Sequence, residues 1–286
     1  PIVDAGTGFE LCANNADIPL NGSVTGATGG TWTGGSGTFT PDANALNAIY
    51  TPSAGEIPAG SLTLTLTSTG NGNCIPVTDQ VTYTFGPAPT ADAGMDQTLC
   101  SNNAEVSLSG SVTVATGGTW SGGAGVFNPS SNDLAAVYTP TPDEIAAGSL
   151  TLTLTTTGNG NCNAVSDDVV IDFTPAPTAN AGADQTVCAN NVDVNLNASI
   201  SVATGATWSG GTGTFSPDAN ALNAVYTPSA TEITSGSVTL TLTTTGNGNC
   251  LPVTDEITIT ITPEPIVEAG PDMDICSNNS AFALGG

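Results

Sequence analysis

Seven cysteines are the residues of this 286-residue chain whose type and spacing could do chemistry. A thiol can form a disulfide, bind a metal or act as a nucleophile. The cysteines fall into two series with a period of 88 residues, Cys12, Cys100, Cys188 and Cys276 in one and Cys74, Cys162 and Cys250 in the other. No Cys-x-x-Cys pair and no histidine accompanies them, so disulfides are favoured over a metal site.

Catalysis lacks its usual groups, because the chain has no histidine and no lysine to serve as a general base. Neighbouring acidic residues occur only as adjacent pairs, and adjacent residues of a strand point to opposite faces. These pairs are Asp143-Glu144, Asp167-Asp168 and Asp255-Glu256. We therefore predict a protein that is not an enzyme and has no catalytic residues.

Calcium is the one cofactor that the sequence raises. Four aspartates near the starts of the repeats, Asp4, Asp92, Asp96 and Asp184, could supply hard oxygen ligands. The positions of Asp92 and Asp96 are not kept, because Asn180 and Glu268 replace the first and Gly8 replaces the second. Solvated carboxylates are the favoured interpretation, with calcium as the alternative.

The net charge of −25, which arises from 25 acidic residues and no lysine or arginine, limits the partners. A chain without cations cannot neutralise phosphates, so we expect no nucleic-acid partner. An anionic membrane would repel it. No apolar run approaches the roughly 20 residues that span a bilayer, so we expect no membrane insertion.

The 88-residue period extends beyond the cysteines to Trp32, Trp120 and Trp208. Each copy opens with Pro-x-x-(Asp/Asn/Glu)-Ala-Gly, which predicts a linker. The expected domains are residues 1–88, 89–176 and 177–264, followed at 265–286 by the start of a fourth repeat. We expect the chain to be a segment of a longer protein built from such copies.

Leucine and threonine alternate at residues 62–67, which predicts a half-buried strand with threonine facing solvent. A Gly-Asn-Gly-Asn turn follows at residues 70–73, and a closing strand is expected at 77–85. Seven or eight short strands per repeat predict an all-β fold of tandem Ig-like antiparallel β-sandwich modules in an elongated array.

The tryptophans Trp32, Trp120 and Trp208 have two interpretations. One tryptophan per repeat could form a platform that stacks on sugars, and repetition would add avidity. A sandwich strand also commonly carries a core tryptophan. We favour the core.

Three motifs carry a resemblance to a known family. They are Asp-Ala-Gly-x-Asp-Gln-Thr-(Leu/Val)-Cys, as at residues 92–100, the sequence Gly-Thr-Trp-(Ser/Thr)-Gly-Gly, and the terminal Asn-Gly-Asn-Cys. They resemble Ig-like, polycystic-kidney-disease-like repeats in very large surface proteins that Bacteroidota export by type IX secretion. The resemblance implies an extracellular, cell-surface appendage such as an adhesin, a gliding filament or a hook.

The cysteine pairing follows from the expected strand order. Pairing within a repeat, Cys12 with Cys74, would join opposite poles of a sandwich about 30 Å apart, whereas a disulfide allows a Cα–Cα distance of about 4.4–6.8 Å. We favour pairs between neighbours, Cys12 with Cys162 and Cys100 with Cys250. Cys74, Cys188 and Cys276 would then bond to further modules outside the given sequence. Pairing within repeats, Cys74 with Cys100, and free thiols are the alternatives.

The expected function is a stalk or filament segment of a large extracellular bacterial surface protein that projects or links adhesive parts. Its partners would be neighbouring repeats of the same chain. One alternative is a multivalent adhesin module that binds glycans. Another is a self-assembling hook or filament subunit, whose partners would be other copies of itself; cell-surface glycans could also be bound through other regions.

Overall fold

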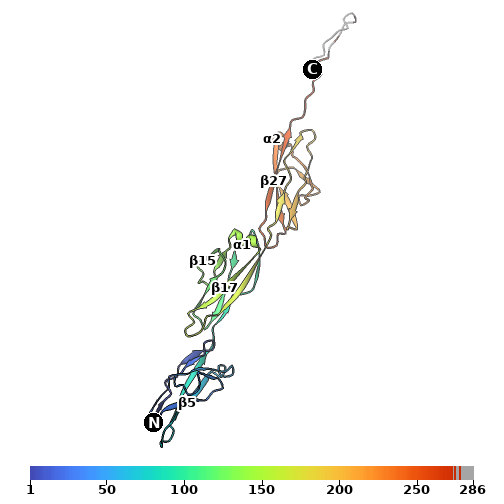
Figure 1. The fold of residues 1–286 in the computed structure, drawn as a ribbon. Helices are drawn as coiled ribbons and strands as arrows, with labels where there is room; N and C mark the ends of the chain where they lie inside the picture. Colours follow the sequence, from blue (N-terminus) through green and yellow to red (C-terminus); the bar gives the residue numbers. More distant parts are fainter. Residues whose placement is uncertain (273, 275–276, 278–286) are drawn as a thin grey trace. The chain divides into compact units, whose positions relative to one another are not determined.

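A computed structural model describes residues 1–272, 274 and 277 of the chain. By its internal contacts the chain divides into two compact units. Figure 1 traces the chain in sequence order, with strands as its main elements. The first unit combines Pro1–Thr98 with Ala104–Phe173, and the second combines Leu99–Asn103 with the chain from Thr174 on. Residues 88 and 176 both lie between strands, in proline-containing segments.

Nine strands make up the first repeat. They are β1 (Ile2–Asp4), β2 (Glu10–Cys12), β3 (Ile18–Pro19), β4 (Ser23–Thr25), β5 (Gly29–Thr33), β6 (Thr38–Thr40), β7 (Ile49–Thr51), β8 (Ser61–Thr69) and β9 (Thr78–Gly86). One layer is a sheet of order β2-β9-β8-β5, in which β2 runs parallel to β9. The other layer contains the sheet β3-β7-β6 and the pair β1-β4.

The second and third repeats have the same sheets. The second consists of β10 (Thr90–Asp92), β11 (Gln97–Cys100), β12 (Val106–Ser107), β13 (Ser111–Thr113), β14 (Gly117–Ser121), β15 (Val126–Asn128), β16 (Val137–Thr139), α1 (Pro142–Ala147), β17 (Ser149–Thr157) and β18 (Ser166–Thr174). The third consists of β19 (Thr178–Asn180), β20 (Gln185–Cys188), β21 (Val194–Asn195), β22 (Ser199–Ser201), β23 (Gly205–Ser209), β24 (Thr214–Ser216), β25 (Val225–Thr227), α2 (Ala230–Ser235), β26 (Ser237–Thr245) and β27 (Thr254–Thr262).

This strand order is that of an Ig-like sandwich, in which strands A, B, E and D form one sheet and C, F and G the other. In the first repeat β1 corresponds to A, β3 with β4 to B, β6 to D and β7 to E, while β5, β8 and β9 correspond to C, F and G. The fold is therefore all-β, with three tandem β-sandwich modules in the described part of the chain.

Two short helices, α1 and α2, are features that the sequence analysis did not predict. Each has six residues and is too short to show helical periodicity. The residues that cap its ends therefore specify where the helix forms. Thr141 and Glu144 form a capping box around α1, and Ser229 and Glu232 do the same for α2. Among the described residues, no helix is long and apolar enough to cross a membrane.

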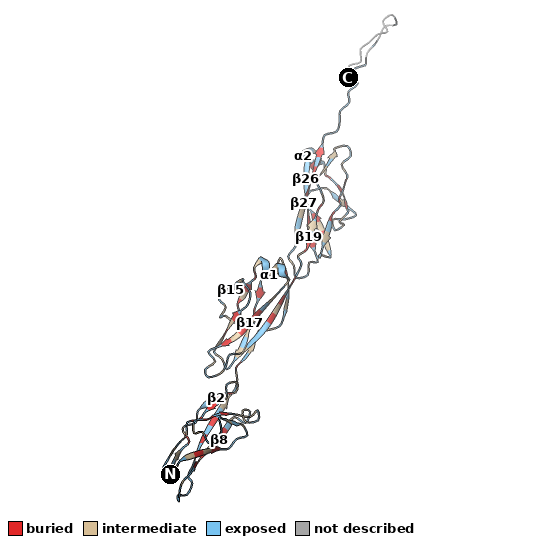
Figure 2. Cartoon of the chain, viewed as in Figure 1, coloured by how far each residue is buried: buried red, intermediate tan, exposed pale blue. Residues whose placement is uncertain are grey.

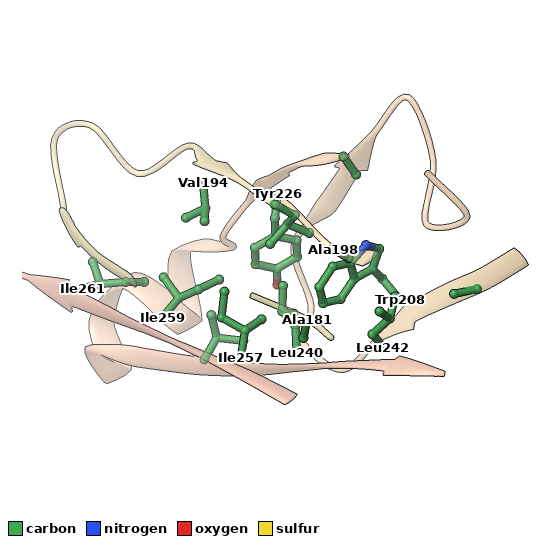
Figure 3. Packing of buried hydrophobic residues seen from close by; sticks show 14 residues of the cluster. Ala181, Val194, Ala198, Trp208, Tyr226, Leu240, Leu242, Ile257, Ile259 and Ile261 are labelled. Atoms are coloured by element: carbon green, nitrogen blue, oxygen red, sulfur yellow. The ribbon is translucent and has the colours of Figure 1, made fainter. Parts of the chain in front are cut away.

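The core of each module lies between its two layers. The strands β8, β17 and β26 carry buried residues, red in Figure 2, because leucine alternates with threonine along them. In the third module Ile257, Ile259 and Leu240 point toward Val194 and Tyr226 of the facing layer (Figure 3). Trp32, Trp120 and Trp208 are only 1%, 2% and 2% exposed, so they are core residues and their rings cannot stack on a sugar.

A tyrosine and a glutamate form a latch in each of the three modules, with the tyrosine buried in all three and the glutamate buried in the third and half-buried in the first and second. In the third module the Tyr226 hydroxyl donates to Glu232 Oε1 at 2.8 Å, and the same carboxylate accepts from the backbone N–H groups of Thr212 and Ser229 at 2.6 and 2.7 Å. Tyr50 with Glu56 and Tyr138 with Glu144 repeat the arrangement. The latch ties the loop before β24 to the start of α2.

The latch shifts the pKa of both of its members. Burial alone would raise the pKa of Glu232, but the hydrogen bonds from Ser229, Thr212 and Tyr226 to its carboxylate outweigh burial and lower the pKa. Burial, together with the bond to Glu232, raises the pKa of Tyr226 to about 12. At neutral pH the latch is therefore an ionised glutamate that accepts from a neutral tyrosine.

Candidate functional site

The turn that follows β2 positions the first cysteine of the candidate site. β2 pairs with the last strand of its module, so that Cys12 lies opposite Gly86 at the end of β9. The turn then closes through a bond from Asn15 N to Cys12 O at 3.0 Å, while Ala13 N donates to Gly86 O at 2.9 Å. Cys12 is thereby held beside the linker that leads to the second module.

The hairpin between β17 and β18 positions the other cysteine, Cys162. The buried Thr156 fixes the hairpin, because its N–H donates to Val165 O at 2.9 Å and its hydroxyl accepts from Val165 N at 3.0 Å. Gly158 and Gly160 have φ values of +67° and +60°, which favour glycine in this turn. Cys162 follows, and its N–H donates to Asn159 O at 3.0 Å.

Cys12 and Cys162 form a disulfide within the first unit, with an S–S distance of 2.02 Å and a Cα–Cα distance of 5.0 Å. Cys100 and Cys250 form the second disulfide, within the second unit, at 1.99 Å and 5.0 Å. These are the pairs between neighbouring repeats that the expected strand order favoured. Cys12 is not bonded to Cys74, which is a free, exposed thiol.

Asparagine side chains bind the backbone next to the first disulfide. Asn14 Nδ2 donates to Asn163 O at 2.9 Å, and Asn14 Oδ1 accepts from Asn163 N at 3.0 Å. One side-chain amide thus pairs with both backbone groups of a single residue, as a neighbouring strand would. Asn15 Nδ2 adds a bond to Asn161 O at 2.9 Å.

The second disulfide has the same surroundings. Asn102 Nδ2 donates to Leu251 O at 3.1 Å, Asn102 Oδ1 accepts from Leu251 N at 3.0 Å, and Asn103 Nδ2 donates to Asn249 O at 3.1 Å. We call each disulfide with its three asparagine bonds a clasp. The three asparagine bonds of each clasp use only backbone atoms of the hairpin, so they accept Asn163 in one case and Leu251 in the other. The first clasp has one more bond, from Asn163 Nδ2 to Asn14 O at 2.7 Å.

A linker proline lies against each disulfide. Pro87 O is 3.7 Å from Cys12 Sγ and 3.8 Å from Cys162 Sγ, and Pro175 O is 3.9 and 3.8 Å from the sulfurs of Cys100 and Cys250. Cys12 and Cys100 are 2% and 0% exposed. Each linker is thus packed against its clasp, and these two sulfurs are shielded from solvent.

The four calcium candidates do not come together. Asp4 and Asp92 accept from Gly6 N and Gly94 N at 2.8 and 2.9 Å, and Asp96 and Asp184 accept from Val170 N and Thr258 N, both at 2.8 Å. Asn180 serves equally well at the Asp92 position, where its Oδ1 accepts from Gly182 N at 2.8 Å. In the described part of the chain, no three acidic, cysteine or histidine side chains are grouped for a metal.

The remaining cysteines have different positions. Cys188 is a free thiol, half-buried, at the end of β20. Cys276 lies outside the described residues, so its expected bond to another module has no structural counterpart here.

Sequence reasoning missed the asparagines of the clasps and an acidic contact that recurs in all three modules, in the first of which Asp79 accepts from Ala5 N at 2.8 Å. The signal for the asparagines is the Asn-Asn pair two residues after Cys12, Cys100 and Cys188. Asp167, which we considered only as half of an acidic pair, accepts from Ala93 N at 2.8 Å, and Asp255 accepts from Ala181 N at 2.7 Å. These bonds tie the first strand of a module to its last.

No protein-family model and no curated protein matches the chain. Among solved structures, it is similar to an E-to-A variant of titin domains I67–I69 (11% identity, 92% of this chain and 98% of that one, TM-score 0.41). It is also similar to Drosophila N-cadherin EC1-4 (13%, 90% and 73%, 0.36) and to mouse cadherin-23 EC22-24 (16%, 90% and 96%, 0.34).

The class of the protein rests on its own strand order and disulfides. It consists of tandem Ig-like β-sandwich modules in which neighbours are joined covalently by clasps. Disulfides persist in oxidising surroundings such as the cell exterior, and the fold is consistent with an extracellular location.

Proposed function

We propose that this chain is a structural segment of a large extracellular bacterial surface protein, where it forms part of a stalk that transmits tension between the cell and more distant parts. The observation that carries the proposal is the interleaving of the two disulfides. Cys100 lies between Cys12 and Cys162 in the sequence, and Cys162 lies between Cys100 and Cys250.

Interleaving gives the chain three covalent routes between the two disulfides. Two routes contain 88 residues each (100 − 12 and 250 − 162), and the third contains 62 (162 − 100). When the ends are pulled apart, the shortest route becomes fully extended first and then bears the tension. This route runs through the second module. The other two routes, through the first and third modules, are spared from full extension.

Composition supports a mechanical role. Without lysine, arginine or histidine, side chains cannot form ion pairs, so the fold relies on apolar burial, backbone ladders, latches and disulfides. None of these interactions depends strongly on ionic strength, in contrast to exposed ion pairs. Buried tryptophans leave no aromatic platform of the kind considered for a glycan-binding module.

The finer parts of this proposal rest on the sequence resemblance alone. They are a location on the surface of a Bacteroidota cell, export by type IX secretion, and membership of an adhesin, gliding filament or hook. Neighbouring repeats of the same protein are the proposed partners.

Single-molecule stretching from the two ends tests the mechanical role. Fully extended at about 3.5 Å per residue, the oxidised path from Cys12 to Cys250 is limited to about 220 Å, whereas the reduced path of 238 residues (250 − 12) reaches about 830 Å. Removing either clasp alone, by Cys12→Ser with Cys162→Ser or by Cys100→Ser with Cys250→Ser, should give about 310 Å in both cases.

The two double variants are matched controls, because each leaves a shortest route of 88 residues. An oxidised chain that extends as far as the reduced one would refute the proposal. So would a difference in final length between the two double variants.

A further inference from the structure

The first module differs from the other two at the start of β2, beside the first clasp. The period of 88 residues places Phe9 and Glu10 where the second module has Gln97 and Thr98. We propose that the hollow lined by Phe9 and Glu10 binds an organic cation of the guanidinium type, such as an arginine side chain. The inference goes beyond the proposed function and does not depend on it.

A close backbone contact determines where Phe9 lies. The segment between β1 and β2 passes so near to β9 that a Cβ at Gly8 would overlap with Thr82 O, so this path requires a glycine. Phe9 O then accepts from Thr84 N at 3.3 Å. The second module has Asp96 in place of Gly8, so its chain cannot follow the same path.

The ring of Phe9 packs on a tyrosine that is also particular to the first module. Its centroid is 5.2 Å from that of Tyr83, at an interplanar angle of 81°. Ile171 and Ile259 replace this tyrosine in the other modules. Tyr83 is 2% exposed, whereas Phe9 is 44% exposed. The edge-to-face pair therefore holds the Phe9 ring in place while part of that ring remains open to solvent.

In the other modules a glutamine closes this edge of the sandwich. Gln97 Nε2 donates to Ser107 O at 3.0 Å, which joins β11 to β12 across the two layers. In the third module Gln185 Nε2 donates to Asn195 O at the same distance. A phenylalanine cannot donate such a bond, so the first module presents a ring at the position where the others have a closing hydrogen bond.

Phe9 lines a hollow of about 340 Å³ within the first compact unit. The volume falls in the range of about 300–1,000 Å³ that is typical of small-molecule sites. The first clasp contributes to the lining, because Asn15 Nδ2 donates to Asn161 O at 2.9 Å. The other lining residues are Glu10, Leu11, Asn15, Asp17 and Asn161.

The two carboxylates of the hollow have no cationic side chain on this chain to pair with. Glu10 and Asp17 are both exposed, and the sequence contains no lysine, arginine or histidine. The Thr51 hydroxyl donates to Asp17 Oδ1 at 2.8 Å, which orients that carboxylate. An ion pair with a side chain at this place therefore requires a partner from outside the chain.

A guanidinium fits these groups better than a metal ion does. Its flat face stacks on an aromatic ring, and its N–H groups bind carboxylates in the plane of the group. Within the described residues no three acidic, cysteine or histidine side chains are grouped to hold a metal. Two sources have this chemistry, a free small molecule and an arginine side chain of another protein.

The test follows backbone amide shifts of the full, oxidised chain by NMR during titration with acetyl-arginine amide, whose only charge is one guanidinium. Acetyl-citrulline amide, which has nearly the same shape and no charge, is the matched ligand control. We expect shift changes at residues 9–17 and 161, and about tenfold weaker binding of the citrulline compound. Equal affinities would overturn the inference, as would equal shift changes at residues 97–105.

Asp17→Asn should weaken the binding of acetyl-arginine amide about threefold, because it removes one exposed charge from the hollow. Asp193→Asn is the matched control, since Asp193 accepts from a threonine hydroxyl at 2.7 Å in the third module as Asp17 does in the first. It should leave the affinity unchanged. Equal weakening by both variants would mean a general attraction to the net charge of −25 and would refute the site.

Phe9→Gln with Glu10→Thr gives the first module the residues of the second and should abolish the shift changes at residues 9–17. Its melting temperature shows whether the variant is folded. Binding that persists in the folded variant would overturn the inference. If the variant does not fold, the comparison of Asp17→Asn with Asp193→Asn still decides.

A pentapeptide Gly-Gly-Arg-Gly-Gly with both ends blocked separates the two sources. Tighter binding of the peptide than of acetyl-arginine amide would support a protein partner, and equal binding would support a free small molecule; both results support a guanidinium site. None of these titrations bears on the stretching of the two clasps, so the proposed function stands or falls separately.

Discussion

The core of the third module and the clasp that holds its hairpin are stabilised in different ways. The core buries side chains such as Trp208, Leu240 and Ile259, all of which come from one repeat. The clasp combines a disulfide with side-chain amides that bind backbone groups of another repeat. The difference teaches that the core contacts of a module come from its own sequence, whereas a clasp forms only when two repeats meet under oxidising conditions. We therefore expect a module to keep its core when its clasp is opened.

The largest expected effect is a loss of stability in the core of the third module, which leaves the clasp chemistry unchanged. Trp208→Ala should lower the free energy of unfolding of the third module by about 3–5 kcal/mol, because it leaves a cavity between the layers. Hydrogen exchange followed by mass spectrometry would measure the loss along the chain. Protection at residues 178–262 should fall, while protection at residues 1–86 should not change.

Reduction of the wild-type disulfides is the counterpart of that experiment. It should leave exchange within the core of the third module nearly unchanged, since no core contact is lost. If reduction lowered core protection as much as Trp208→Ala does, the module would depend on its clasp and the comparison would fail.

The latch should have the next largest effect. Glu232→Gln should destabilise the third module by about 2 kcal/mol at pH 7, because it removes a buried charge that accepts three hydrogen bonds. Denaturant unfolding would measure this change. The control is Glu256→Gln, which alters an exposed glutamate of the same module and should change stability little.

The pH dependence of the latch follows from the pKa shifts. The folded-state pKa of Glu232 is lowered, so its stabilisation is full above the unfolded pKa, about 4.3, and is lost as the pH falls through the folded value. The pKa of Tyr226 is raised to about 12, so its stabilisation is lost as the pH rises from about 10 to 12. The melting temperature of the third module, measured against pH, tests this account. If it fell in acid as steeply in the Glu232→Gln variant as in the wild type, the account would be wrong.

The smallest expected effect is a change in how easily the disulfide of one clasp is reduced. Asn102→Ala removes two bonds to the backbone of Leu251 and should make the Cys100–Cys250 disulfide about tenfold easier to reduce, the equivalent of about one net hydrogen bond. Equilibration in glutathione buffers, followed by alkylation and mass spectrometry, would measure the reduced fraction.

The same molecules contain the controls for that measurement. The Cys12–Cys162 disulfide should keep its wild-type equilibrium in Asn102→Ala. Asn190→Ala, in the equivalent turn that binds no hairpin within the described part of the chain, should change neither disulfide. Equal shifts of both disulfides would mean that the asparagine acts through the whole fold and not through its own clasp.

Much of the fold could be predicted from the sequence because burial follows local periodicity. The alternation at residues 62–67 predicts that Leu64 and Leu66 face the core and Thr63 faces solvent, and the structure agrees. The helices α1 and α2 could not be found in this way, because six residues between a cap and a glycine carry no repeating apolar face.

The candidate site was predictable in part. Strand order alone favoured bonds from Cys12 to Cys162 and from Cys100 to Cys250, since the turn after β2 and the hairpin of the same module lie at opposite poles of a sandwich. The asparagines next to them were not foreseen, because a side-chain amide can serve as a turn residue or as a bridge to another repeat, and its local sequence is the same in both cases.

The sequence by itself determined the period of 88 residues, the β class, the lack of ion pairs and which face of the alternating strand is buried, because each depends on composition or on the spacing of near neighbours. Only the tertiary structure decided which distant atoms come together, namely those of Cys12 and Cys162, 150 residues apart, and those of Asn14 and Asn163, 149 residues apart. The physical reason is that a disulfide and a hydrogen bond require contact within a few ångströms, and contact at that range depends on the path of the whole chain.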